Sequence, residues 1–273
     1  MPLLPYTDAP DELLTLFHSE KESVLARYYE PEPGLFIAES AKVAQRAAQA
    51  GYEIRSMLIE DAQLNQEARE LLSRFPDLAA YHAPSAEFRR ISGYPMTRGV
   101  LALFRRKENS RPDPVRLTVQ GKRIAVLVEV GNPANIGSIF RNAAALGIDQ
   151  VLLSKGCCDP LSRRCLRVSM GCVFQVPWIM TGMTGAEIVI MLKQQKVLSA
   201  AMALSDDSVS ITDPILPKAP RLAIFLGNEG NGLPEETIRA CDYVVRIPMN
   251  KDVDSLNVAA ASAVAFWQLR ADS

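Results

Sequence analysis

The stretch Ile124-Ala-Val-Leu-Val-Glu-Val130 decides the fold class, because it is an almost continuous run of β-branched and apolar residues. A strand that is buried on both faces of a parallel sheet has this composition. Residues 134–146 follow as an expected helix, which Gly147 ends. Strand-like and helix-like segments then alternate along the chain, which predicts an α/β fold with a parallel sheet and helices on both of its faces.

The same alternation predicts the other elements of this half of the chain. We expect further strands at 151–153, 174–179, 197–203, 222–226 and 243–247, and helices at about 160–168, 184–194 and 255–270.

A small α/β unit is expected before residue 108, with strands at 35–38, 54–59 and 99–104 and helices at 40–50 and 67–75. Residues 108–120 contain two prolines and no helical period, which is typical of a linker. The predicted organisation is therefore a first domain at 1–107, a linker at 108–121 and a second domain at 122–273.

Composition excludes several classes of protein. The 273 residues include 30 basic and 31 acidic side chains, so the net charge of -1 rules out a highly basic nucleic-acid coat. Five cysteines without a CxxC pair argue against a zinc site or a disulfide scaffold and predict reduced thiols in the cytoplasm. No signal peptide is expected, and the apolar stretch 258–269 is shorter than the roughly 20 residues of a membrane span. We expect neither a metal nor a membrane.

Three polar clusters follow expected strands, at 129–141, 227–232 and 247–257. In open α/β sheets, ligands bind beyond the carboxyl ends of the strands. Asn135 begins an expected helix and Arg141 lies two turns further on, an arrangement that suits a phosphate. The glycines around Glu229 allow close backbone approach. Taken singly, each cluster is a weak signal. Asn135 and Ser255 could be helix caps, Arg141 could form a surface ion pair, and the glycine loop could be a plain tight turn.

Together, the clusters resemble the ordered motifs of the SpoU (TrmH-like) RNA 2′-O-ribose methyltransferases of the SPOUT superfamily. The motifs are Asn135-Ile-Gly-Ser-Ile-Phe-Arg141, Phe225-Leu-Gly-Asn-Glu-Gly-Asn-Gly-Leu233, and Ile247-Pro-Met249 with Ser255-Leu-Asn-Val258. Asp159-Pro-Leu161 and Arg167-Val-Ser-Met-Gly171 are also similar to the family. Phe36-Ile-Ala-Glu-Ser-Ala-Lys-Val43 resembles the L30e-like RNA-binding domain that accompanies the family.

This resemblance implies a fold and a reaction. The parallel-sheet SPOUT domain would carry a C-terminal trefoil knot, which ordinary chain topology argues against, and would form a homodimer through the last helix. The reaction would transfer a methyl group from S-adenosylmethionine to a ribose 2′-hydroxyl of structured RNA. The RNA would be rRNA rather than tRNA, because the companion domain is typical of the rRNA-directed branch.

The resemblance also implies roles for individual residues. The catalytic residues would be Asn135, Arg141, Glu229, Ser255 and Asn257. The cofactor would be lined by Leu226, Gly227, Ile247, Met249 and Leu256, with residues 202–204 nearby. RNA would meet Arg89, Arg90, Arg98, Arg105 and Arg106, which could otherwise form a solvated face.

Several alternatives stay open at this point. Either Arg141 or Glu229 could handle the proton, although arginine is effectively always protonated. The last helix could be buried within its own subunit instead of forming an interface. Lys251 and Asp254 depart from the usual family motif, which leaves the substrate preference open. The alternatives to an rRNA methyltransferase are a catalytically silent RNA-binding or ribosome-assembly protein and a tRNA 2′-O-methyltransferase. A dinucleotide-dependent enzyme is disfavoured because GxGxxG is absent.

Overall fold

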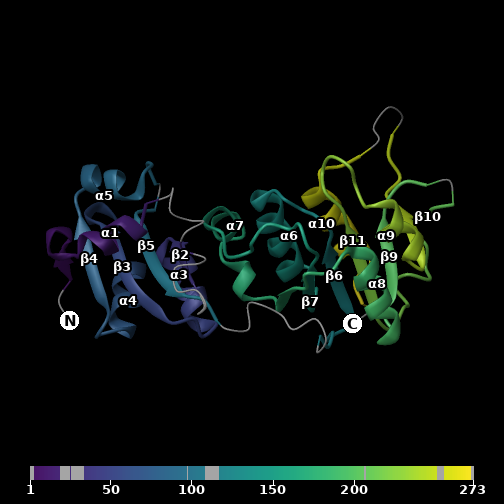
Figure 1. Cartoon of the computed structure of the whole chain (residues 1–273), viewed down its shortest axis with the longest axis horizontal. Coiled ribbons are helices and arrows are strands. Elements are labelled where there is room, and N and C mark those ends of the chain that lie inside the picture. The colour runs from purple at the N-terminus through teal and green to yellow at the C-terminus, as the bar shows by residue number, and fades with distance from the viewer. Residues whose placement is uncertain are drawn as a thin grey trace. The chain divides into compact units, whose positions relative to one another are not determined.

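The computed structural model describes residues 3–18, 25, 34–96, 98–107, 117–205, 207–250 and 255–271. Its contacts divide the chain into two compact units (Figure 1). The N-terminal unit contains Met1–Ser110 together with Leu161–Phe174, and the C-terminal unit contains Arg111–Pro160 and Gln175–Ser273. Most of the expected linker, as well as Lys251 and Asp254, lies outside the described residues.

The N-terminal unit is built on a mixed five-stranded sheet in the order β1-β4-β3-β5-β2. Its strands β1, β4 and β3 are parallel, whereas β5 is antiparallel to both β3 and β2. The strands are β1 (Leu4–Pro5), β2 (Leu35–Glu39), β3 (Ile54–Glu60), β4 (Ala79–Ala83) and β5 (Val100–Arg105).

Short helices complete this unit. They are α1 (Asp11–Leu16), α3 (Ala41–Gln49), α4 (Gln66–Arg74), α5 (Ser85–Ser92) and α7 (Arg163–Val168). The side chains of successive strand residues point to opposite faces of the sheet. Leu35 and Ile37 of β2 join one buried apolar cluster, whereas Phe36 stacks on Phe104 with ring centroids 5.3 Å apart.

The C-terminal unit contains a seven-stranded sheet in the order β10-β12-β9-β11-β6-β7-β8. Every pairing in it is parallel, which confirms the predicted parallel α/β architecture. The strands are β6 (Arg123–Leu127), β7 (Gln150–Leu153), β8 (Trp178–Met180), β9 (Leu198–Met202), β10 (Val209–Ser210), β11 (Leu222–Leu226) and β12 (Tyr243–Arg246).

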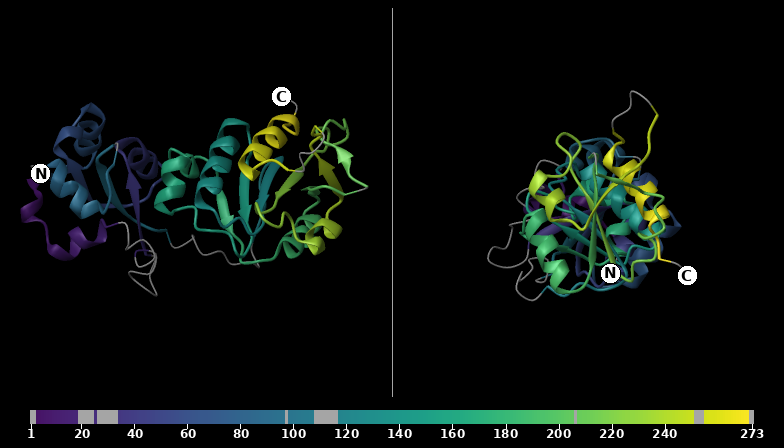
Figure 2. Two further views of the ribbon diagram at one scale, coloured as in Figure 1. Left: turned by 90° about the horizontal axis from the view of Figure 1, so that it is seen from above. Right: turned by 90° about the vertical axis from the view of Figure 1, so that its right-hand side faces the viewer.

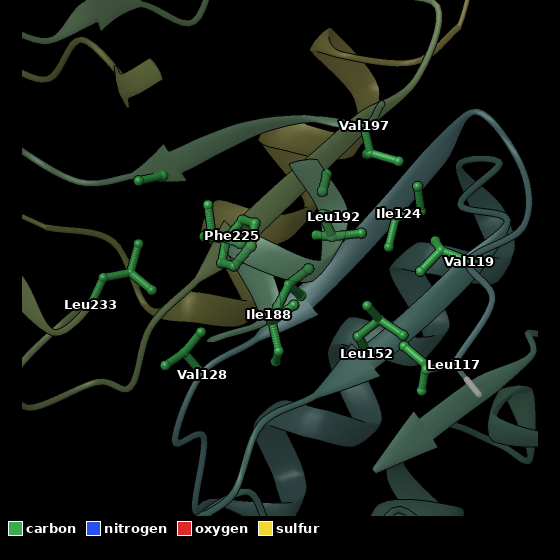
Figure 3. Close-up of a cluster of buried hydrophobic side chains, with 14 residues drawn as sticks. Leu117, Val119, Ile124, Val128, Leu152, Ile188, Leu192, Val197, Phe225 and Leu233 are labelled. Carbon is green, nitrogen blue, oxygen red and sulfur yellow. The ribbon is translucent and has the colours of Figure 1, made fainter. Parts of the chain in front are cut away.

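Helices lie on both sides of this sheet (Figure 2). Helices α6 (Pro133–Ala145) and α10 (Val258–Gln268) pack against each other, as do α8 (Gly185–Gln194) and α9 (Glu235–Ala240). Between the sheet and α8, a buried apolar cluster joins Phe225 of β11 and Ile124 of β6 to Ile188 and Leu192 (Figure 3). This core fixes the carboxyl ends of β6 and β11, from which the polar clusters extend.

The expected strand at 174–179 is wrong at residues 174–177, because residues 172–174 form a 3-10 helix and β8 begins only at Trp178. Phe174 lies instead in an aromatic group of the N-terminal unit, with its ring centroid 5.8 Å from that of Phe36 and 5.3 Å from that of Tyr52. Aromatic packing within a different unit therefore overrides the apolar pattern that predicted a strand.

Candidate functional site

The polar clusters lie where the strand order of the C-terminal sheet reverses. Beyond β6, the chain first adds β7 and β8 on one side, and then places β11 on the other side of β6. Where the connections from two adjacent parallel strands run to opposite sides, a crevice forms at the carboxyl ends of these strands. This crevice is the usual ligand site of open α/β sheets. The segments that follow β6 and β11 therefore meet at this edge.

The segment after β6 enters helix α6 through a conventional cap. The Asn132 side chain accepts a hydrogen bond from the backbone N–H of Ala134 at 2.9 Å, and Pro133 occupies the first turn. Asn135 is thus in the first turn of α6 and is not the cap. Its side chain is buried, and its Nδ2 donates to Oε1 of Glu229 in the loop after β11.

The third cluster joins this pair through Asn257. Asn257 Nδ2 donates to Asn135 Oδ1 at 3.3 Å, while its own Oδ1 caps α10 by accepting from the N–H of Ala259 at 2.9 Å. The hydrogen-bonded chain Asn257–Asn135–Glu229 therefore connects all three sequence clusters. Both oxygen and nitrogen of each amide are used, so the amides have one defined orientation.

The loop after β11 owes its shape to Gly227 and Asn228. A Cβ on Gly227 would lie under 3.0 Å from the backbone of Gly232 and Leu233, so the loop closes this tightly only with glycine there. The Asn228 side chain accepts from the N–H groups of Gly230 at 2.9 Å and Asn231 at 2.7 Å. Asn228 is a structural residue that the sequence reasoning missed, although its Asn-x-Gly pattern is typical of such turns.

A cavity of about 340 Å³ opens beside this loop. All five residues expected around a cofactor lie in its wall, namely Leu226, Gly227, Ile247, Met249 and Leu256, and so do residues 202–204. Glu229 and Ser255 also line it. Arg246, which the sequence reasoning did not single out, lines the cavity as well and donates to the Ser208 carbonyl oxygen.

Arg141 occupies a different position from the other expected catalytic residues. It is exposed on α6, does not line the cavity, and forms no hydrogen bond or ion pair with any residue that the structure describes. Asn142 beside it, which the sequence reasoning missed, donates from Nδ2 to the Ala259 carbonyl oxygen and to Ser262 Oγ, both at 2.9 Å. Asn142 therefore ties α6 to α10, and its low helix propensity was the available signal.

The five arginines expected to contact RNA lie on α5 and around the two ends of β5 in the N-terminal unit. Arg89 and Arg90 are exposed on α5, where Arg90 pairs with Glu87 at 2.8 Å. Arg98 is exposed just before β5. Arg105 and Arg106 are half-buried at the other end of that strand, so about 20 Å of extended chain separates them from Arg98.

Two further properties concern the described part of the chain. None of its helices is long and apolar enough to cross a lipid bilayer. Within the same residues, His, Cys, Asp and Glu side chains do not gather in groups of three or more that could hold a metal ion.

Comparison with known proteins gives consistent results for sequence and structure. A Mycobacterium tuberculosis protein described as an uncharacterised tRNA/rRNA methyltransferase is 36% identical over 86% of this chain and 80% of its own length. The crystal structure of an RNA 2′-O ribose methyltransferase has a TM-score of 0.75 and 26% identity, and the match covers 98% of both chains.

An AdoMet-bound rRNA methyltransferase from Sinorhizobium meliloti shares the fold, with a TM-score of 0.77, 24% identity, and coverage of 98% of this chain and 96% of that one. The sequence model of the SpoU rRNA Methylase family matches residues 122–267, which is more than half of the chain. By this match and by its identity to the mycobacterial relative, the chain belongs to the SpoU rRNA methylase family.

Proposed function

We propose that this protein transfers a methyl group from S-adenosylmethionine to a ribose 2′-hydroxyl of structured RNA, and that the RNA is rRNA in preference to tRNA. As a SpoU family member, the chain is an RNA methyltransferase. The observation that carries the finer proposal is the chain Asn257–Asn135–Glu229 beside the cavity. The solved RNA 2′-O ribose methyltransferase supports the ribose as acceptor, and the family description supports rRNA.

The cavity suits the cofactor in size and in chemistry. Its volume of about 340 Å³ falls within the range of roughly 300–1,000 Å³ that small-molecule sites occupy. Leu226, Ile247, Met249 and Leu256 provide an apolar wall for an adenine ring. The glycine loop at 227–232 brings backbone N–H and C=O groups to the rim, where they can bind the polar parts of the molecule. When bound, the cofactor supplies a methyl group on a positively charged sulfur.

The residues of this chain would then position the ribose and receive its proton. A hydroxyl is a weak nucleophile and must lose its proton during attack, so a base is needed. We assign this role to Glu229, because its carboxylate lines the cavity and Asn135 holds one of its oxygens. Ser255, which also lines the cavity, would hydrogen-bond the ribose. Arg141 would bind the adjacent phosphate and stabilise developing negative charge.

The remaining parts of the proposal concern assembly. We propose a homodimer through α10, on which Val264 is 40% and Trp267 is 57% exposed in the single chain. The C-terminal trefoil knot belongs to the same proposal, supported by the insertion of β11 between β6 and β9. The N-terminal unit would serve as an L30e-like RNA-binding domain. We also propose that the protein is located in the cytoplasm, which suits an RNA substrate and the free cysteines.

The decisive experiment measures transfer of labelled methyl from S-adenosylmethionine to total RNA from cells that lack this gene. Naked RNA and ribosomal particles are both tested, and the RNA is digested to nucleosides. We expect label in 2′-O-methyl nucleosides of rRNA, lost in Arg141→Ala and in Glu229→Gln but retained in the exposed control Arg239→Ala. If the protein binds RNA but transfers no methyl group to any of these substrates, the catalytically silent alternative is supported. If the label is confined to tRNA, the substrate is tRNA and the proposal of rRNA is wrong.

A further inference from the structure

A second cavity, of about 310 Å³, belongs to the N-terminal unit and has no part in the proposed methyl transfer. Its wall joins the end of β2, the start of α3, the turn after α5, and the end of α7 with the turn that follows it. The lining residues are Glu39, Ser40, Val43, Tyr94, Pro95, Met96, Arg98, Arg167 and Met170.

One wall of this cavity is a buried ionic network centred on Glu39. The Glu39 side chain is 2% exposed and accepts hydrogen bonds from Arg163 Nε at 2.7 Å and from Arg167 Nη1 at 3.1 Å. The Tyr94 hydroxyl donates to the same carboxylate, and the Arg163 and Arg167 guanidinium groups lie 5.4 and 5.8 Å from the centre of its ring. A network with these partners is rigid, so the wall is formed before any ligand arrives.

The charges around the cavity do not balance. Glu39 supplies one negative charge, whereas Arg163, Arg167 and Arg98 supply three positive ones. The Arg167 side chain is half exposed, which leaves part of its guanidinium open to a ligand. The Arg98 side chain is exposed and has no hydrogen-bond or ion-pair partner among the described residues. The cavity therefore presents two guanidinium groups to an anion.

The backbone is held in an unfavourable conformation on both sides of the cavity. Ser40 has φ 85° and ψ 148°, a region almost confined to glycine, and Met170 has φ 53°. Each is held by its neighbours: the Ser40 N–H donates to the Val100 carbonyl at 2.8 Å, and the Met170 carbonyl accepts from Arg46 Nη1 at 2.7 Å. Strain of this kind is concentrated where proteins bind ligands.

We propose that this cavity binds one nucleotide of the RNA with its base out of the helical stack. Arg98 and Arg167 would bind the phosphate, and Tyr94, Met96 and Met170 would supply apolar and aromatic surface for the base. The volume admits one nucleotide and excludes a duplex. The inference rests on the proposed function only in taking the ligand to be RNA.

The test measures RNA binding by the full chain without S-adenosylmethionine, so that it does not depend on catalysis. The probe is a fluorescent single-stranded RNA of ten nucleotides that contains 4-thiouridine, compared with the same sequence as a duplex. The variants are Arg98→Ala, Arg98→Lys and the control Arg55→Ala, which removes an equally charged side chain that pairs with Glu53 on the surface. Thermal unfolding checks that all three variants fold.

We expect tighter binding of the single strand than of the duplex, and photocrosslinks in the tryptic peptide of residues 91–98, which contains Tyr94 and Met96. Arg98→Ala should weaken binding about fivefold or more. It should also make the slope of log binding constant against log salt concentration shallower by about 0.7, the value for one phosphate contact on a single strand. Arg98→Lys should recover part of the affinity, because it keeps the charge without the bidentate geometry. Arg55→Ala should bind like the wild type.

The inference is overturned if the crosslinks lie only elsewhere, or if Arg98→Ala binds like Arg55→Ala, or if the duplex binds as tightly as the single strand. The proposed function fails independently of these results. Crosslinks at residues 91–98 without methyl transfer to any RNA would support the cavity and reject the enzyme. Methyl transfer by an Arg98→Ala variant with unchanged RNA affinity would support the enzyme and reject the cavity.

Discussion

Asn257 donates a hydrogen bond to Asn135 across 3.3 Å, although 122 residues separate them in the chain. The two amides connect the starts of α6 and α10, and Asn135 in turn donates a hydrogen bond to Glu229. A site residue that also caps a helix has two separable roles, because the cap needs an acceptor and the contact with Asn135 needs a donor.

Asn257→Asp separates these roles. The carboxylate still accepts from the N–H of Ala259 but cannot donate to Asn135. We expect methyl transfer to fall at least about tenfold while the melting temperature stays close to that of the wild type. Asn257→Ala should lose activity to a similar extent and also cost about 1 kcal/mol of stability.

Asn65 provides the matched control for the cap. Its side chain accepts from the N–H of Ala68 at 3.0 Å at the start of α4, in the N-terminal unit. Asn65→Ala should also cost about 1 kcal/mol but leave methyl transfer unchanged. Full activity in Asn257→Asp would show that the contact with Asn135 does not support catalysis.

Gly227→Ala should weaken cofactor binding without unfolding the C-terminal unit. The added methyl group would collide with the backbone of Gly232 and Leu233, so the loop that borders the cavity must move outward. Calorimetric titration with S-adenosylmethionine should show an increase in Kd of about tenfold or more, equivalent to about 1.4 kcal/mol.

The control for this loop is Gly131→Ala, since a Cβ at Gly131 meets nothing within 4 Å. We expect this variant to bind the cofactor as the wild type does. An unchanged Kd in Gly227→Ala would mean that the cofactor does not depend on the shape of the 227–232 loop.

Arg123 should prove essential to stability. It is 1% exposed, and its guanidinium donates to the carbonyl oxygens of Leu269 at 2.5 Å, Pro217 at 2.6 Å and Ala219 at 3.0 Å. Arg123→Met leaves these carbonyl groups without that donor and should lower the free energy of unfolding in urea by about 3–5 kcal/mol. Arg123→Lys should restore only part of it, because an ammonium cannot reproduce the planar fork.

The comparison for Arg123 is Arg239, whose side chain is 77% exposed and pairs with Glu235 within α9. Arg239→Met should change the free energy of unfolding by less than about 0.5 kcal/mol. Equal effects of the two substitutions would show that the carbonyl contacts of Arg123 add nothing to stability.

Strong local patterns explain which parts of the structure the sequence predicted. The central strands β6 and β11 are uninterrupted apolar runs, and glycine or asparagine marks the loops that follow them. Strand β4 was missed because Ala79–Ala83 consists mainly of alanine, which has low β propensity. Helix α5 was missed with it.

The long-range contacts could not be predicted in the same way. Nothing in the local pattern distinguishes Arg123, buried against carbonyl groups, from a solvated basic residue before a strand. Leu161–Phe174 groups with the N-terminal unit, and within that unit Arg163 pairs with Glu39 across 124 residues. Such pairs arise from tertiary packing, and the periodicity of helices and strands contains no information about them.

Tyr94 should make stability depend on alkaline pH. Burial raises the pKa of Tyr94 to about 12, against about 10 in an unfolded chain. Between these values, the unfolded chain has released a proton that the folded chain retains, so unfolding becomes more favourable as the pH rises. The stabilisation is complete below pH of about 10 and is lost as the pH approaches about 12.

Urea unfolding of wild type and Tyr94→Phe over this alkaline range measures the effect. The free energy of unfolding should fall more steeply with pH for the wild type than for Tyr94→Phe. The extra fall should be clearly less than the roughly 2.7 kcal/mol that two pKa units represent, because the ring is partly solvated. Tyr94→Phe also removes the hydroxyl that donates to Glu39, so its stability at neutral pH should be lower. Parallel pH profiles would mean that the hydroxyl titrates alike in both states, and that the Glu39 network does not hold its proton.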